Sequence, residues 1–227
     1  MTCCQVDDIG RQFDRANANK ELRRLRRRGP ASYTRLLIDA LSRDLVDGAR
    51  LLDIGGGVGT IHHFLLDSAA REAIHVDISD SYLEVAREEA TRRGHSGQVT
   101  FIHGDFVAVA SQLPTVDVVT LDRVICCYPD MHALVDAAAR KTTRLFGAVY
   151  PRETWWVRIV VVCINVLRRL KRSTFRMYLH APAAIAATLR DAGLVRSSLH
   201  RTLFWEIAVY RRESGAHYPR RLVEQLP

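Results

Sequence analysis

Residues 51–59 read Leu-Leu-Asp-Ile-Gly-Gly-Gly-Val-Gly, and this segment constrains the fold more than any other part of the chain. A short apolar run ends at Asp53, four glycines follow, and a helical pattern begins at Thr60. This order predicts a strand, a tight turn and a helix N-terminus, the usual cradle for a nucleotide-like cofactor. Glycine suits the turn because a side chain would hold a cofactor off the backbone, and because tight turns can require positive φ.

The spacing of these glycines distinguishes two templates. A dinucleotide fingerprint requires G-x-G-x-x-G/A, and counting from Gly55 and Gly57 its third position falls on Thr60. The series Asp53, Gly55, Gly57 and Gly59 instead resembles motif I of class I S-adenosylmethionine (SAM) methyltransferases. A turn without a ligand is the structural alternative, and an NAD(P)-dependent oxidoreductase is the weaker functional one.

Three further buried strands are predicted, and each ends in a polar or glycine-rich loop. They span residues 73–78, 99–103 and 116–121. Asp77 follows the glycines by about 20 positions, where an acidic residue accepts hydrogen bonds from ribose hydroxyls. Asp105 is placed to bond an adenine amino group, with Phe106 packing on the ring. Since the carboxyl ends of parallel strands share one edge, we expect one cofactor site there. Its residues are Asp53, Gly55, Gly57, Gly59, Asp77, Ile78, Asp105, Phe106 and Asp122. Helix N-capping is the simpler alternative for Asp77 and for Asp105.

Strands and helices alternate between residues 50 and 150, which predicts a Rossmann-like, doubly wound, mostly parallel sheet. A helix is expected over residues 129–145 and a short strand over 148–150. An insertion, a helix and two closing strands follow at residues 152–180, 182–192, 195–200 and 203–210. The methyltransferase resemblance also implies seven strands with a terminal hairpin. The expected division is an N-terminal helical cap (1–46), a cofactor-binding domain (47–213) with a lid insertion (152–180), and a tail (214–227).

Composition narrows the partners and the setting. The formal net charge of +8 permits nucleic acid, an anionic membrane or an acidic substrate. The five cysteines, at positions 3, 4, 126, 127 and 163, fit neither a zinc-ligand spacing nor a disulfide framework, so no metal is expected. The N-terminus is polar and arginine-rich where a secretory signal would be apolar. We therefore expect a reduced, cytoplasmic protein.

Basic residues gather in two runs, at residues 23–28 and 168–176. Each run is either a solvated helix face or a binding surface. The runs motivate an RNA methyltransferase as an alternative, but the sequence lacks an Asn/Asp-Pro-Pro-aromatic motif and an appended RNA-binding domain. A nucleic-acid acceptor is therefore the less favoured one. A SAM-binding scaffold without catalysis is the alternative from another class.

The insertion contains an apolar run, Trp155–Leu167, that ends in the second basic run. It is shorter than the roughly 20 apolar residues that a membrane span requires. Three interpretations stay open. The run is a lid over a flat apolar acceptor, a peripheral helix on an anionic membrane, or a core helix on the sheet.

Methyl transfer from a sulfonium is an in-line displacement, so an enzyme mainly has to align donor and acceptor. The loop after the fourth strand, residues 122–130, is expected on the acceptor side. Tyr128 and Cys127 would lie beside the sulfonium, and Arg123 either clamps a carboxylate or pairs with a local acid. These three are the candidate catalytic residues, while inert buried thiols are the alternative for the cysteines. His62 and His180 are weaker candidates, for which packing or surface roles compete.

Two segments, Asp117–Pro129 and Arg28–Thr34, are similar to magnesium-protoporphyrin IX O-methyltransferases. The resemblance implies SAM as methyl donor, S-adenosylhomocysteine (SAH) as product, and a propionate carboxylate of a flat tetrapyrrole as acceptor. The chain departs from the family at Cys127, where the family has a histidine, and at Phe13, which lies where the family has a tyrosine-bearing helix. We therefore expect methyl transfer to a small or medium organic acceptor, flat or aromatic, with an oxygen as the atom that receives the methyl group.

Overall fold

The computed structural model describes residues 13–171, 173 and 175–213. A seven-stranded sheet forms its centre, with the strand order β3-β2-β1-β4-β5-β7-β6. The strands are β1 (Ala49–Ile54), β2 (Ala70–Asp77), β3 (Val99–His103), β4 (Val116–Asp122), β5 (Thr142–Pro151), β6 (Leu194–Arg201) and β7 (Trp205–Arg212). β1 to β5 pair in parallel, and β7 is antiparallel to β5 and β6. The predicted seven-stranded, mostly parallel sheet with a terminal hairpin is therefore confirmed.

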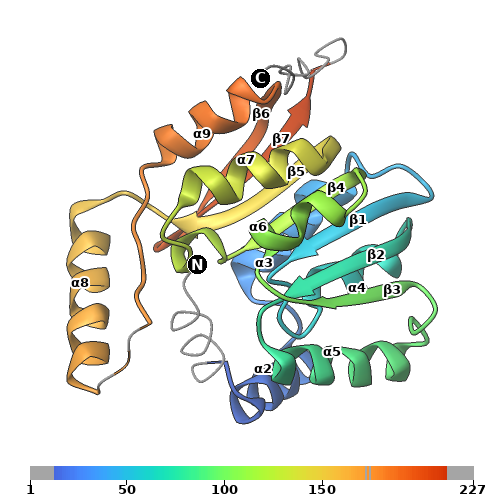
Figure 1. Cartoon of the computed structure of the whole chain (residues 1–227), viewed down its shortest axis with the longest axis horizontal. Helices are drawn as coiled ribbons and strands as arrows, with labels where there is room; N and C mark the ends of the chain where they lie inside the picture. The colour runs from blue at the N-terminus through green and yellow to red at the C-terminus, as the bar shows by residue number, and fades with distance from the viewer. Residues whose placement is uncertain (1–12, 172, 174, 214–227) are drawn as a thin grey trace, which may run out of the picture.

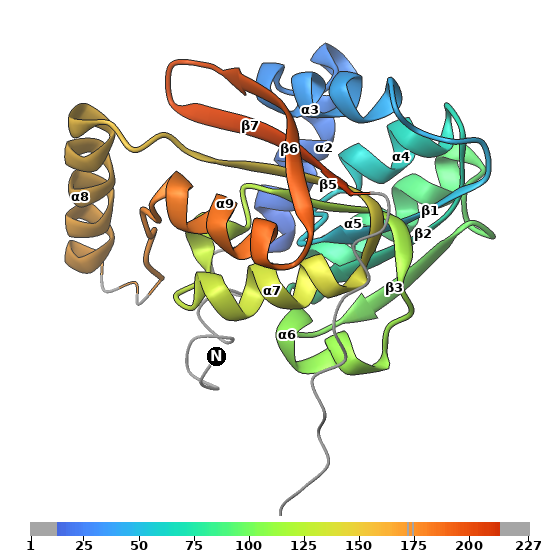
Figure 2. The same ribbon diagram turned by 90° about the horizontal axis from the view of Figure 1, so that it is seen from above.

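Helices cover both faces of this sheet. They are α2 (Arg15–Arg28), α3 (Ser32–Ser42), α4 (Thr60–Leu66), α5 (Asp80–Arg93), α6 (Phe106–Val109), α7 (Met131–Lys141), α8 (Trp155–Leu170) and α9 (Pro182–Asp191). α3, α4 and α5 pack on one face, and α6, α7 and α9 on the other (Figures 1 and 2). Separate apolar clusters fill the two interfaces, one around Leu41 and Leu51 and the other around Val119 and Phe146.

The helix that was expected to reach residue 145 ends at Lys141, and β5 begins at once at Thr142. The Thr142 hydroxyl donates to Ala138 O and so closes the helix without a glycine or proline. Beyond it, Leu145 and Phe146 are buried in opposite apolar clusters, which is the alternation of a strand. The prediction of a helix to residue 145 and of a three-residue strand was wrong because no turn residue separates the two elements.

The first two helices differ in what they cover. α3 belongs to the main layers, because it packs on β5 and β7. Gly147 in β5 permits this approach, since an added Cβ would lie 2.8 Å from Leu37 Cδ1. α2 packs instead on α5, where the Asp14 carboxylate caps its first turn by accepting from Asn17 N at 2.8 Å. The division of the chain into a cap, a cofactor domain and a tail stays a prediction, and Cys3, Cys4 and the tail 214–227 lie outside the described residues.

α8 is set apart from the layers. Both views place it beside the sheet, on neither face (Figures 1 and 2). Only Val157 and Val161 of this helix are buried, so it is not a core helix. In the described part of the chain, no helix has both the length and the apolar character that crossing a membrane requires.

Candidate functional site

A cavity of about 310 Å³ opens at the carboxyl edge of the central strands, within the size range of small-molecule sites. Strand-end residues of β1, β2 and β4 line it, together with the loop after β3. Ten of the twelve residues expected from sequence lie in its wall. They are Gly55, Gly57, Asp77, Ile78, Asp105, Phe106, Asp122, Arg123, Cys127 and Tyr128.

The glycine loop forms one wall of this cavity. Gly55 and Gly57 have φ values of 60° and 58°, in the left-handed region that favours glycine. Gly57 N donates to Asp77 Oδ2 at 3.0 Å, and Ser79 N donates to Asp77 Oδ1 at 2.9 Å. Ser79, rather than Asp77, is the N-cap of α5. Asp77 therefore fixes the loop, and each of its oxygens keeps lone pairs for a further donor.

Asp53 and Gly59, the other two expected residues, do not line the cavity. The Asp53 carboxylate is fully buried beneath the loop, where it accepts from Thr120 Oγ1 at 2.7 Å and from His62 Nδ1 at 3.0 Å. Burial lowers the pKa of His62 to about 4, so this ring is neutral at pH 7 and donates through Nδ1. Burial opposes the charge of Asp53, but its hydrogen bond from His62 lowers its pKa on balance.

This buried layer also accounts for two glycines of the loop. A Cβ on Gly59 would lie 2.6 Å from the His62 ring, and one on Gly56 would lie 2.7 Å from Asp53 Oδ2. The loop is thus held from below by a network that a ligand in the cavity does not touch. His62 serves packing, as the simpler interpretation of this residue had it.

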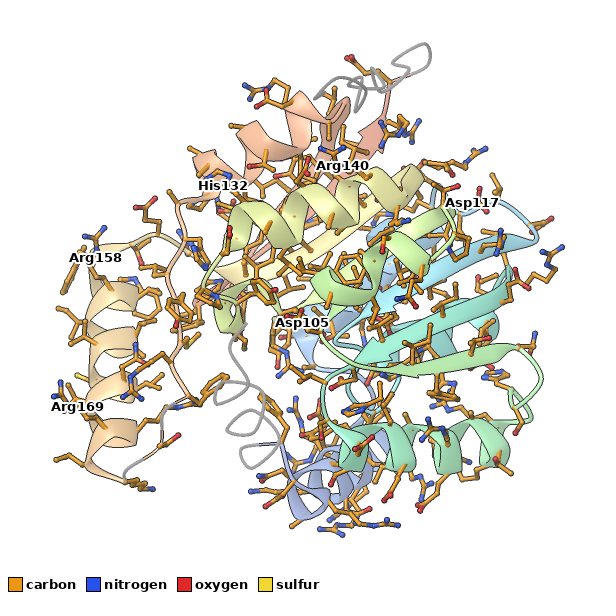
Figure 3. All side chains as sticks on the ribbon, viewed as in Figure 1. Asp105, Asp117, His132, Arg140, Arg158 and Arg169 are labelled. Carbon is orange, nitrogen blue, oxygen red and sulfur yellow. The ribbon has the colours of Figure 1, made fainter. Side chains whose placement is uncertain are left out.

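Asp105 lies at the beginning of α6, where Figure 3 labels it. Its carboxylate caps that helix by accepting from Val107 N at 3.1 Å, as the capping alternative predicts. It also accepts from the Tyr128 hydroxyl, which lies 3.1 Å from both oxygens. Burial raises the pKa of Tyr128, and the negative charge of Asp105 adds to the shift. Tyr128 is therefore a protonated anchor for Asp105 and does not offer a base.

Asp122 ends β4, and Arg123 follows it. Because β1 lies between β2 and β4, these two residues are on the other side of the glycine loop from Asp77. Asp122 Oδ2 accepts from Thr34 Oγ1 at 2.7 Å. Arg123 lies 3.3 Å from Glu21 and stacks over the Tyr33 ring. Burial raises the pKa of Asp122. For Arg123, burial opposes the charge, but Asp122 and Glu21 outweigh it and raise the pKa.

Asp122 and Arg123 each have one buried polar atom without a hydrogen-bond partner among the described residues. Asp122 Oδ1 lies 3.4 Å from Arg123 Nε, but the pair does not have hydrogen-bond geometry. Both atoms are buried and have no hydrogen-bond partner among the residues that the structure describes. Most buried polar atoms in proteins have a hydrogen-bond partner, so an unpartnered donor and acceptor in a cavity wall are candidates for contact with a ligand.

The adjacent thiols Cys126 and Cys127 line the next part of the wall. Their Sγ atoms are 3.9 Å apart, and both lie within 3.4 Å of the Arg123 carbonyl oxygen. The hydrogen bond from Cys126 lowers the pKa of Cys127, and the charges of Arg123 and Arg168 lower it further. The same bond raises the pKa of Cys126. Cys127 is therefore the more acidic thiol of the two.

The insertion supplies part of the cavity wall, through residues that the sequence analysis did not single out. Arg168, Phe175 and Met177 face the cavity, and Phe13 and Trp205 join them. The Arg168 guanidinium lies 4.3 Å from the Phe175 ring centroid, and its Nη1 is buried without a hydrogen-bond partner in the described residues. Burial lowers the pKa of Arg168. Its place on the inner face agrees with helical spacing, because it follows the buried Val157 and Val161 by 11 and 7 positions.

Two contacts join this wall to the loop that follows β4. Tyr178 N donates to Cys126 O at 2.7 Å, and His180 Nε2 lies 2.9 Å from Tyr128 O. The segment that returns from α8 is thus attached to the loop that carries Cys127. In the part of the chain that the structure describes, no group of three His, Cys, Asp or Glu side chains is arranged to hold a metal ion.

Residues 51–144 match the model of a protein family described as a methyltransferase domain. The matched segment, which is less than half of the chain, is similar to that domain. The matched segment carries the glycine loop, Asp77, Asp105 and the loop through Tyr128, so it covers the strand-end part of the cavity wall and stops before the insertion. It confirms the resemblance to class I methyltransferases that the glycine spacing predicts.

Individual relatives of the methyltransferase domain differ in what their names say they methylate. One is a ubiquinone/menaquinone biosynthesis C-methyltransferase of Rhizobium leguminosarum, 29% identical over 110 residues, which are 48% of this chain and 43% of that protein. Another is protein arginine N-methyltransferase 1 of Saccharomyces cerevisiae, 32% identical over 88 residues, which are 39% of this chain and 24% of that protein. The chain thus spans less than half the length of these curated relatives.

A solved structure matches the methyltransferase domain and its surroundings over a longer stretch. Magnesium protoporphyrin IX methyltransferase from Synechocystis PCC 6803, with bound SAH, superposes with a TM-score of 0.69. The match covers 90% of this chain and 99% of that one, at 21% identity. At this identity the likeness establishes the fold, which is the class I methyltransferase fold.

Proposed function

We propose that the chain binds SAM in this cavity and transfers its methyl group to an organic acceptor, leaving SAH. The observation that carries the proposal is the unsatisfied pair of Asp122 Oδ1 and Arg123 Nε. An acceptor of hydrogen bonds and a donor, of opposite charge and side by side, suit the ammonium and the carboxylate of an amino acid. The methionyl group of SAM is such a zwitterion.

The other groups in the wall suit the rest of SAM. Asp77 keeps lone pairs for ribose hydroxyls, and Ile78 and Phe106 offer apolar surfaces for an adenine ring. The carboxylates of Glu21, Asp77, Asp105 and Asp122 line the cavity, opposed by two arginines. This negative balance favours a sulfonium cation. A similar fold was solved with bound SAM and with bound SAH, which supports the assignment.

SAM supplies an electrophilic methyl group on a sulfonium, which is an excellent leaving group. The residues of this chain then have three tasks. The wall of Phe13, Phe175, Met177 and Trp205 excludes water and packs against a flat or aromatic acceptor. Arg168 holds an anionic group of that acceptor through its unsatisfied Nη1. Cys127 takes the proton from an acceptor hydroxyl, so that the oxygen is methylated.

Calorimetry on the full chain tests the cofactor part. SAM and SAH should both bind, and Asp122→Asn should weaken SAM binding at least tenfold, about 1.4 kcal/mol. Asp136→Asn is the matched control, because Asp136 forms an exposed pair with Arg140 on α7. It should leave the affinity unchanged. Absence of binding of either compound to folded protein contradicts the proposal.

Two alternatives lead to different results with the same protein. An RNA methyltransferase predicts RNA binding that weakens steeply with salt, because phosphate contacts release counterions. A SAM-binding scaffold predicts SAM affinity without turnover. Consumption of SAM in the presence of a small-molecule extract, with weak and salt-insensitive RNA binding, separates the proposed activity from both. A cytoplasmic location stays a prediction.

A further inference from the structure

The outer face of α8 is apolar and exposed. Of the eight large apolar side chains exposed in the described part of the chain, six lie on this helix. Five of them follow helical spacing along one face, between 51 and 76% exposed: Trp155, Ile159, Val162, Val166 and Leu170. The opposite face carries Val157, Val161 and Arg168 toward the protein. An uncovered apolar face of this kind marks an interaction surface.

The apolar face continues onto the β6–β7 turn. Phe204, in this turn, packs edge to face on Trp156 with ring centroids 6.0 Å apart. Its neighbour Leu203 is 79% exposed. Exposed apolar side chains therefore lie on two elements that contact each other, and we call the five α8 side chains together with Leu203 the outer apolar face.

Basic side chains flank this face. Arg158 and Arg169 lie three helical turns apart on one flank, and Figure 3 shows both pointing away from the sheet. Lys171 follows at the end of the helix and is exposed. The sequence has no acidic residue from Thr154 to Arg190, and the nearest one, Glu153, lies 3.5 Å from Arg158. The surface is thus apolar and cationic on balance, with Glu153 offsetting the charge of Arg158 but no carboxylate close to Arg169 or Lys171 in the sequence.

We propose that the outer apolar face docks on the surface of an anionic lipid bilayer. A helix with an apolar face, basic residues beside it and tryptophan at one end is suited to lie in the interfacial plane. Its 16 residues extend about 24 Å, too short to span the hydrocarbon core, so the helix lies on the membrane and does not cross it.

The charges argue against a second copy of the chain as the occupant. Two copies of α8 packed face to face would bring arginine against arginine, with no carboxylate on either helix to compensate. An anionic lipid headgroup supplies the missing negative charge. The proposal stands apart from the proposed methyl transfer, since it uses neither the cavity nor its cofactor groups.

Flotation of the full chain with lipid vesicles tests the docking. The protein should float with vesicles of phosphatidylcholine mixed with phosphatidylglycerol and stay behind with phosphatidylcholine alone. Val166→Glu should reduce the bound fraction at least tenfold. Val195→Glu is the matched control, because it makes the same change at another exposed valine, on β6, and should bind as the wild type does. Both variants should keep the wild-type affinity for SAH or the wild-type melting temperature.

The charge contribution has its own variant. Arg169→Gln should weaken binding to the mixed vesicles about fivefold, and added salt should weaken wild-type binding in the same direction. Equal binding to both lipid compositions, or no vesicle binding at all, overturns the proposal. It is also overturned if the chain self-associates in analytical ultracentrifugation and Val166→Glu, but not Val195→Glu, abolishes that association.

Discussion

Asp122 Oδ1 lies 3.4 Å from Arg123 Nε in the cavity wall, and neither atom has a hydrogen-bond partner among the described residues. The backbone conformation at Arg123 holds the two side chains in this position. Arg123 has φ 64°, the one positive φ at a non-glycine residue in the described chain, and its N donates to Val149 O at 3.0 Å. Strain of this kind persists where the surroundings over-determine it, often at ligand sites.

The glycine loop should be sensitive to a single methyl group. Gly57→Ala places a Cβ in ordinary contact with Tyr82, so space is sufficient, but φ 58° strains an alanine. We expect a loss of unfolding free energy on the order of 1 kcal/mol and at least tenfold weaker SAM binding. Urea unfolding and calorimetry measure the two effects. Gly97→Ala, which has open space and no positive φ, should change neither.

Arg168 should act on the acceptor and leave the cofactor alone. Arg168→Gln removes the charge that faces the cavity, so the SAH complex should bind flat aromatic carboxylates at least tenfold more weakly. Arg169→Gln, at the next position but on the exposed flank of α8, is the matched control and should bind them as the wild type does. SAM affinity should be the same in all three proteins. A loss that is equal in both variants would show a non-specific charge effect.

Cys127 should set the acid limb of the rate profile. Because its pKa is lowered by the hydrogen bond from Cys126, kcat/KM should stay high at pH values below the ordinary thiol range and fall only as pH drops through the lowered pKa. Cys126→Ala removes that bond and should move the limb to higher pH. Cys163→Ala, exposed on α8, should leave it in place. An unchanged profile in Cys127→Ala would exclude this thiol as the base.

The buried residues His62 and Asp53, beneath the glycine loop, should make the free energy of unfolding depend on pH. The His62 pKa falls from 6.5 to about 4 on burial, so the unfolded chain binds more protons between these values. The free energy of unfolding should therefore decrease as pH falls from 6.5 toward 4. His62→Gln should make this decrease shallower, and His132→Gln, on exposed α7 surface, should not. Urea unfolding at pH 7 and at pH 4.5 gives the comparison.

Most of the cavity wall at the carboxyl edge of the sheet could be predicted from the sequence. Asp77, Asp105 and Asp122 could be placed from sequence because parallel strands must end at one edge, and a short apolar run before each residue is visible. Asp53 was misplaced because sequence does not tell which side of the strand end its carboxylate takes. His62, nine positions further along the chain, hydrogen-bonds the Asp53 carboxylate on the side away from the cavity.

The boundary between α7 and β5 and the inner face of α8 were harder to predict, for physical reasons. β5 was underestimated because Thr142 closes the helix and opens the strand with no turn residue between them. α8 is apolar nearly all round, so its sequence does not tell an inner face from an outer one. Arg168 was grouped with its neighbours by charge, although its spacing from Val157 and Val161 assigns it to the inner face.

The most direct test is a crystal structure of the full chain grown with SAH. We predict the ribose on Asp77, the amino group on Asp122 Oδ1 and the carboxylate within reach of Arg123 Nε. Density for SAH elsewhere, or a methionyl group turned away from both Asp122 and Arg123, would contradict the account.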